Sequence, residues 1–163
     1  MKKSKKQNII IVSIAIIIIG AIAGYNYSVD QTKQKGLKFG NELQQIQEDV
    51  KQLQVEFNSK ITQLEEGDLT QQELSEYSKT HIEKLQNAIL RYDDLIPPKQ
   101  FASSVELFKL STQAQLDSDK EFIEWIKTGD DSHNIRSDSS LQESFEYEMM
   151  ALGEFNAAKS GLR

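Results

Sequence analysis

The sequence contains no cysteine, and this absence removes several kinds of chemistry at once. Without thiols the chain can form no disulfide, no thiolate nucleophile and no zinc site with sulfur ligands. An exported domain of this chain must therefore be held together by its hydrophobic core alone. A length of about 130 residues is sufficient for such a core.

Motifs that carry catalysis are also missing. The chain has two histidines, no phosphate-binding Gly-rich loop, no Gly-x-Ser-x-Gly and no His-Glu-x-x-His. A narrow helical bundle, which the pattern below predicts, offers little concave surface for a substrate. We therefore predict that the protein is not an enzyme, and we assign it no catalytic residue, no cofactor and no metal site.

The chain does contain one long uncharged segment, residues 9–25. Lysines stand at positions 2, 3, 5 and 6 before it, and none follows within the next seven residues. As a helix the segment would span about 25 Å, near the lower limit for a bilayer core of about 30 Å. Because lysines favour the cytoplasmic side, we predict a single-pass cell membrane protein with a cytoplasmic segment 1–8, a transmembrane helix 9–25, a stalk 26–38 and an extracellular domain 39–163.

The same segment has a second interpretation as a cleavable secretory signal. The small residues Ala21 and Ala23 would allow a cut before Gly24, which would release a secreted domain. The apolar run is long for a signal and has no helix breaker before Gly20, and this favours the uncleaved anchor. The absence of cysteine after the run excludes the acyl anchor of a bacterial lipoprotein.

Acidic residues outnumber basic ones. The net charge of the chain is −6, and without the four N-terminal lysines it is −10. An acidic domain is a poor partner for nucleic acid and for anionic polymers, so we predict no nucleic-acid binding. The charge fits a basic or cationic partner.

Residues 39–64 have the clearest helical pattern. Apolar residues recur there at steps of three and four, namely Phe39, Leu43, Ile46, Val50, Leu53, Phe57, Ile61 and Leu64. We expect this stripe to pack inside its own bundle. The alternative is a coiled coil with a second copy of the chain, so a homo-oligomer stays open.

Glycines, prolines and capping residues along the rest of the chain predict where further helices begin and end. Gly67 ends the first helix, and Thr70 with Glu73 forms a capping box for the second. Pro97 and Pro98 end the second helix, and Pro98 fits the first position of the third.

The third helix is predicted to stop near Gly129, and a long polar loop is predicted at 130–139. Ser140 and Glu143 are a possible cap pair for the last helix. The predicted fold class is all-α, an N-terminal transmembrane helix followed by a three- or four-helix up-down antiparallel bundle. Gly36 and Gly40 could loosen the joint between stalk and bundle.

Few side chains qualify as ligands or anchors. We interpret His81 as a partly buried structural histidine, because Lys84 and Leu85 occupy the positions where a second metal ligand would stand. His133, with Asp130 and Asp131, could hold a divalent ion or small ligand weakly, but a solvated turn fits better. Large apolar side chains are usually buried, so we predict that three further residues lie in the core rather than at a partner surface: Trp125, Met149 and Met150.

Residues 95–129 and 141–162 resemble a loose group of small exported or membrane-anchored helical-bundle proteins of Gram-positive bacteria. In that group a Pro-Pro turn opens a long helix, as at Pro97 and Pro98, and a last helix carries small residues, as at Gly153. The resemblance implies a cell-envelope location and no activity. We therefore expect an uncharacterised single-pass protein whose bundle is a protein-interaction or envelope accessory module; the alternatives are a secreted helical protein or a weak metal or small-ligand binder.

Overall fold

The computed structural model describes residues 33–161, and it describes side chains from residue 38 onward. These residues form four α-helices, one short 3-10 turn and no strand: α2 (Lys33–Glu66), α3 (Gln71–Asp93), η1 (Lys99–Phe101), α4 (Ala102–Thr128) and α5 (Asp131–Ser160). The predicted all-α class is confirmed for this part of the chain, with four helices rather than three. The predicted transmembrane helix, residues 9–25, and most of the predicted stalk lie outside it.

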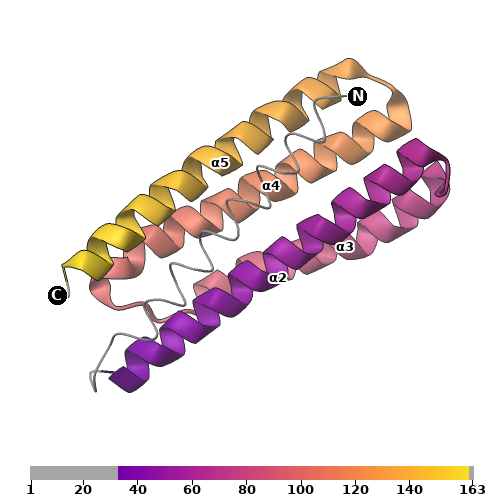
Figure 1. Ribbon diagram of the computed structural model, residues 1–163. Coiled ribbons are helices and arrows are strands. Elements are labelled where there is room, and N and C mark those ends of the chain that lie inside the picture. Colours follow the sequence, from indigo (N-terminus) through magenta and orange to yellow (C-terminus); the bar gives the residue numbers. More distant parts are fainter. Residues whose placement is uncertain (1–32, 162–163) are drawn as a thin grey trace.

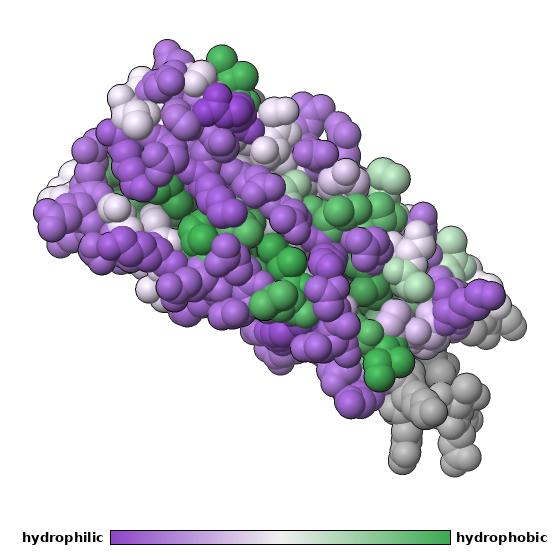
Figure 2. All heavy atoms as spheres, turned by 180° about the vertical axis from the view of Figure 1, so that it is seen from behind, coloured by the Kyte–Doolittle hydropathy of each residue, from purple (hydrophilic) through white to green (hydrophobic). Residues whose placement is uncertain are grey.

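The helices lie side by side as two pairs, α2 with α3 and α4 with α5 (Figure 1). The contact between α4 and α5 is the most extensive, whereas α2 and α5 approach each other less closely in the described chain. None of the four helices combines the length and the apolar character that crossing a membrane requires. From the side opposite to Figure 1, hydrophilic side chains cover most of the surface and hydrophobic ones form a band along it (Figure 2).

The apolar stripe of α2 is buried as predicted. Its members below one-tenth exposure are Phe39, Leu43, Ile46, Leu53 and Phe57, while Val50, Ile61 and Leu64 are half-buried. One end of the core is built around Phe39, Phe101, Phe108 and Phe155, and the other around Phe57, Leu74 and Ile123. The stripe thus packs within its own bundle. Gly36 and Gly40 lie inside α2, which continues through both.

The predicted end of α2 and start of α3 are confirmed, whereas α3 ends at Asp93, four residues before Pro97. Gly67 has a positive φ of 84°, a conformation that costs glycine little, and the chain turns there. Thr70 and Glu73 form the complete capping box at the start of α3. The position of Pro98 differs slightly from its prediction, because Pro98 precedes the 3-10 turn η1 and α4 begins at Ala102.

The predicted polar loop at 130–139 is wrong, since α5 begins at Asp131. Gly129, with φ 71°, ends α4 as predicted, and the Asp130 side chain accepts a hydrogen bond from the backbone N–H of Ser132. This cap lets a helix start at once, because it satisfies a backbone donor that would otherwise lack a partner. The pair Ser140 and Glu143 therefore lies inside α5 and caps nothing.

Small polar residues make much of the contact between α4 and α5, beside the rings of Phe108 and Phe155 at one end, whose centroids lie 6.5 Å apart. The hydroxyl oxygens of Ser118 and Ser137 lie 3.1 Å apart, and those of Ser111 and Ser144 lie 3.2 Å apart. Small side chains let two helices approach closely, so they belong in such an interface although their hydropathy is low. This explains why the polar composition of residues 130–139 gave a wrong prediction.

The same geometry turns the two methionines outward. Met149 and Met150 are each 55% exposed, so their prediction as core residues is wrong. The inward face of α5 is occupied instead by Ser137, Ser144, Ala151, Leu152 and Phe155. Trp125 is half-buried, with its ring 5.4 Å from that of Phe122, and so lies between the two predicted environments.

Candidate functional site

A buried carboxylate, Asp119, stands at the centre of the bundle. Its side chain is on α4 and is only 4% exposed. Three donors from three helices reach it: Gln54 Nε2 on α2 at 2.8 Å, His81 Nε2 on α3 at 2.8 Å, and Gln115 Nε2 on α4 at 2.9 Å. A buried charge is tolerated only when it is hydrogen-bonded in this way.

His81 is more deeply buried than predicted, at 1% exposure. Its ring stacks on Phe57, with centroids 4.4 Å apart and planes within 9°. Because the Asp119 carboxylate accepts a hydrogen bond from Nε2, a neutral ring leaves Nδ1 as an acceptor, and Nδ1 has no hydrogen-bond partner among the described atoms. The structural role predicted for His81 agrees with this environment, in which the ring links α3 to α4.

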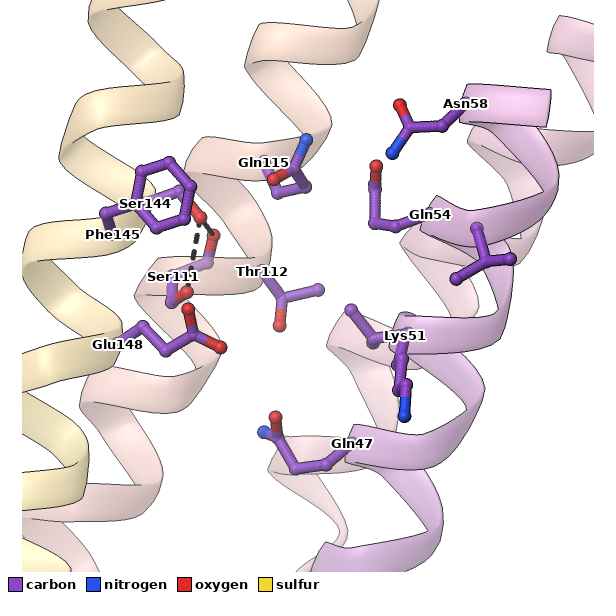
Figure 3. Close-up of a pocket in the computed structure, with 12 residues that line it drawn as sticks. Gln47, Lys51, Gln54, Asn58, Ser111, Thr112, Gln115, Ser144, Phe145 and Glu148 are labelled. Carbon is purple, nitrogen blue, oxygen red and sulfur yellow. Dashed lines mark hydrogen bonds between the residues drawn. The ribbon is translucent and has the colours of Figure 1, made fainter. Parts of the chain in front are cut away.

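The polar interior opens on one side of the bundle into a cleft of about 50 Å³. The cleft lies between α2 on one side and α4 and α5 on the other, and Figure 3 shows the facing side chains. Gln54 and Gln115 line it while holding Asp119 behind them. Its remaining walls carry hydroxyls from Ser111, Thr112 and Ser144 and apolar groups from Val50, Val55 and Phe145.

Two charged side chains line this cleft from opposite sides, Glu148 on α5 and Lys51 on α2 (Figure 3). Burial raises the pKa of the Glu148 carboxyl from its usual 4.5 to about 7. The described residues provide Glu148 with no hydrogen bond and no ion pair. A carboxyl that is desolvated without a partner is a common mark of a binding or reactive position.

A buried tyrosine, Tyr92, is hydrogen-bonded to two residues that line the cleft. The Tyr92 hydroxyl accepts a hydrogen bond from Gln47 Nε2 at 2.6 Å and lies 3.1 Å from Thr112 Oγ1. Burial raises the pKa of Tyr92, and the nearby charge of Glu148 acts in the same direction. The phenol is thus kept neutral and serves as a fixed hydrogen-bonding group.

His133, the second candidate ligand, is placed in the first turn of α5. Its Nδ1 lies 2.6 Å from Glu121 Oε2, and Arg136 Nε donates to the same oxygen at 3.0 Å. Asp130 is occupied as the helix cap, and the hydrogen bond from Ser132 lowers its pKa. In residues 33–161 no three His, Asp or Glu side chains are placed to hold a metal ion together.

Sequence reasoning did not find Glu148, Lys51 or Asp119. Spacing could have found Glu148, which lies four residues after Ser144 and three before Ala151 on the inward face of α5. A charged residue at an inward-facing position of a helix indicates a candidate functional residue. The inward position of Glu148 was not predicted, because the large apolar residues Phe145 and Met149 suggested a different inward face for this helix.

The chain was also compared with known proteins. No protein-family model, no curated protein and no solved structure matches it. The function is therefore inferred from the side chains of the chain itself.

Proposed function

We propose that the protein is a single-pass envelope protein whose four-helix domain lies outside the cytoplasmic membrane and binds another protein. The location is supported by the uncharged segment 9–25 and the lysines before it. The domain is expected in the up-down antiparallel order that short connections favour. Paired contacts between Ser118 and Ser137 and between Ser111 and Ser144 support that order for α4 and α5.

The observation that carries the binding role is the cleft between α2 and α5. It exposes a carboxyl without a partner in the described chain, Glu148, beside the apolar side chains of Val55 and Phe145. Polar and apolar groups that converge on one hollow are typical of recognition sites. The net charge of −10 that remains without the four N-terminal lysines favours a basic partner.

Location and binding can be tested in the same intact cells. With a tag at the C-terminus, we expect full-length protein in the membrane fraction and cleavage of the tag by protease added outside. A photo-crosslinking residue in place of Val55 should capture one defined protein, whereas the same residue in place of Glu83 on α3 should not. Protein in the medium that begins at Gly24 would replace the anchor with the secreted alternative, and equal capture at both positions would contradict the binding role.

The second candidate function is small-ligand binding, and the cleft rather than the 130–133 segment favours it. A hollow of about 50 Å³ holds only a small group. His133 and Asp130 are already engaged with Glu121 and Ser132, so a metal or ligand would have to break those contacts. Heat of binding in a calorimetric titration with divalent ions would support a metal site at 130–133 instead.

A further inference from the structure

We infer that the cleft between α2 and α5 is a pocket for a primary ammonium group carried on an alkyl stem, with Glu148 as its counter-ion. This inference rests on the proposed binding function only for the source of the ammonium group, which is a lysine side chain of a partner protein or a free alkylamine. The chemistry of recognition is the same for both sources.

The hydrogen bonds behind the cleft determine which ligand atoms fit. Gln54 and Gln115 each use the Nε2 donor on Asp119, and Gln47 uses its Nε2 donor on Tyr92. Each amide nitrogen keeps a second N–H, and the three amide oxygens accept no hydrogen bond from a described residue, so these oxygens are acceptors that a ligand can use. An ammonium group can donate its three N–H bonds to these oxygens and to the Glu148 carboxylate.

Glu148 supplies the charge that an ammonium group needs. No described residue hydrogen-bonds or pairs with it, although most of its surface is covered by protein. Charged or titratable groups that face it are Lys51 on α2 and the Tyr92 hydroxyl on α3, while α4 contributes the neutral Ser111 and Thr112. A cation placed beside the carboxylate would replace part of the hydration that burial has removed.

Size and apolar walls favour an alkylammonium over a metal ion. A volume of about 50 Å³ gives room for about three or four water-sized groups. Val50, Val55 and Phe145 provide apolar surface for methylene groups, in the way that lysine stems usually pack. One carboxylate with neutral oxygens is too few charged ligands for tight binding of a divalent ion.

Lys51 is the competitor within the chain. Its side chain lines the same cleft, and among the described residues no ion pair joins it to Glu148. In solution the lysine could swing to the carboxylate and fill the pocket itself. The test must therefore separate an open pocket from one that its own lysine closes.

The test uses the full chain in nanodiscs of zwitterionic lipid, with n-butylammonium chloride as the probe and n-butanol as its neutral counterpart. The titration of the Glu148 carboxyl is followed by carbon NMR. We expect butylammonium to move its midpoint down by half a pH unit or more, and butanol to leave it unchanged. Glu148→Gln should weaken butylammonium binding at least tenfold, and Lys51→Ala should strengthen it a few-fold.

A matched control is Glu154→Gln, which changes an exposed carboxyl on the same helix and should bind as the natural chain does. Binding that survives Glu148→Gln, or binding seen only with Lys51→Ala, would overturn the inference. Tighter binding of a lysine-containing peptide than of putrescine would identify a protein as the source of the ammonium group. Tighter binding of putrescine would identify a free amine. Butylammonium binding without capture at Val55 would support the pocket and contradict the proposed protein partner. Capture at Val55 without butylammonium binding would support the partner and contradict the pocket.

Discussion

Asp119 accepts hydrogen bonds from side chains on α2, α3 and α4, so one buried carboxylate joins three helices. The carboxylate accepts a hydrogen bond from each of these donors, and an apolar side chain at position 119 could accept none of them. Gln54 and His81 come from different helices, so the carboxylate links α2 and α3 to α4. A network of this kind specifies one packing, because any shift would leave a buried donor without an acceptor.

Asp119→Ala should lower the free energy of unfolding by about 3–5 kcal/mol, since it leaves buried donors unpaired. The measurement is urea denaturation followed by circular dichroism. The control is Asp117→Ala, two residues earlier on α4, where an exposed carboxylate lies 3.7 Å from Lys120. That change should cost less than about 1 kcal/mol. Similar losses in both variants would contradict a central role for Asp119.

Glu148 should make the stability of the domain depend on pH. Its folded pKa of about 7 exceeds the usual 4.5, so the folded state retains a proton that the unfolded state releases. This contribution to stability is fully present below about pH 4.5 and is lost as the pH rises through about 7.

Glu148→Gln should therefore stabilise the protein at pH 8 by about 1–3 kcal/mol and change little at pH 5. Urea denaturation of both chains at the two pH values measures the difference. Glu154→Gln on the same helix should show no such gain. An equal effect of Glu148→Gln at pH 5 and pH 8 would mean that its carboxyl is not desolvated.

At the scale of elements, the contact between α4 and α5 depends on small side chains. Ser111 and Ser118 stand seven residues apart on α4, and Ser137 and Ser144 stand seven apart on α5. Two turns of helix bring each pair to the same face. The two helices can therefore approach closely along their length.

Ser144→Leu should destabilise the domain by about 1–3 kcal/mol, because the larger side chain cannot fit between α4 and α5 without forcing them apart. Ser139→Leu places the same side chain at an exposed position of α5 and should be close to neutral. Thermal unfolding of both variants makes the comparison. A neutral Ser144→Leu would indicate that the interface is looser than its hydrogen bonds imply.

At the scale of the whole molecule, the proposed up-down order can be tested with introduced cysteines, because the natural chain has none. Ser118→Cys combined with Ser137→Cys should form a disulfide under mild oxidation, since their hydroxyl oxygens lie 3.1 Å apart. Intact mass would report the loss of two hydrogens.

The control combines Ser118→Cys with Ser144→Cys. Ser144 pairs with Ser111 in the structure, about 10 Å along α4 from Ser118, which is too far for a bond within one chain. Equal disulfide yields from the two combinations would contradict the proposed order of α4 and α5.

Local chemistry was enough to determine much of this protein from its sequence: the all-α class, the apolar stripe of α2, the Thr70 capping box and the chain turns at Gly67 and Gly129. Periodicity, capping and positive φ act within a few residues, so the sequence displays them directly. Only the tertiary structure decided that 131–139 is helical, that Met149 faces outward and that Glu148 and Lys51 line the same cleft. These outcomes depend on which face of α5 packs against α4, and close approach through serines outweighed the larger apolar residues on another face.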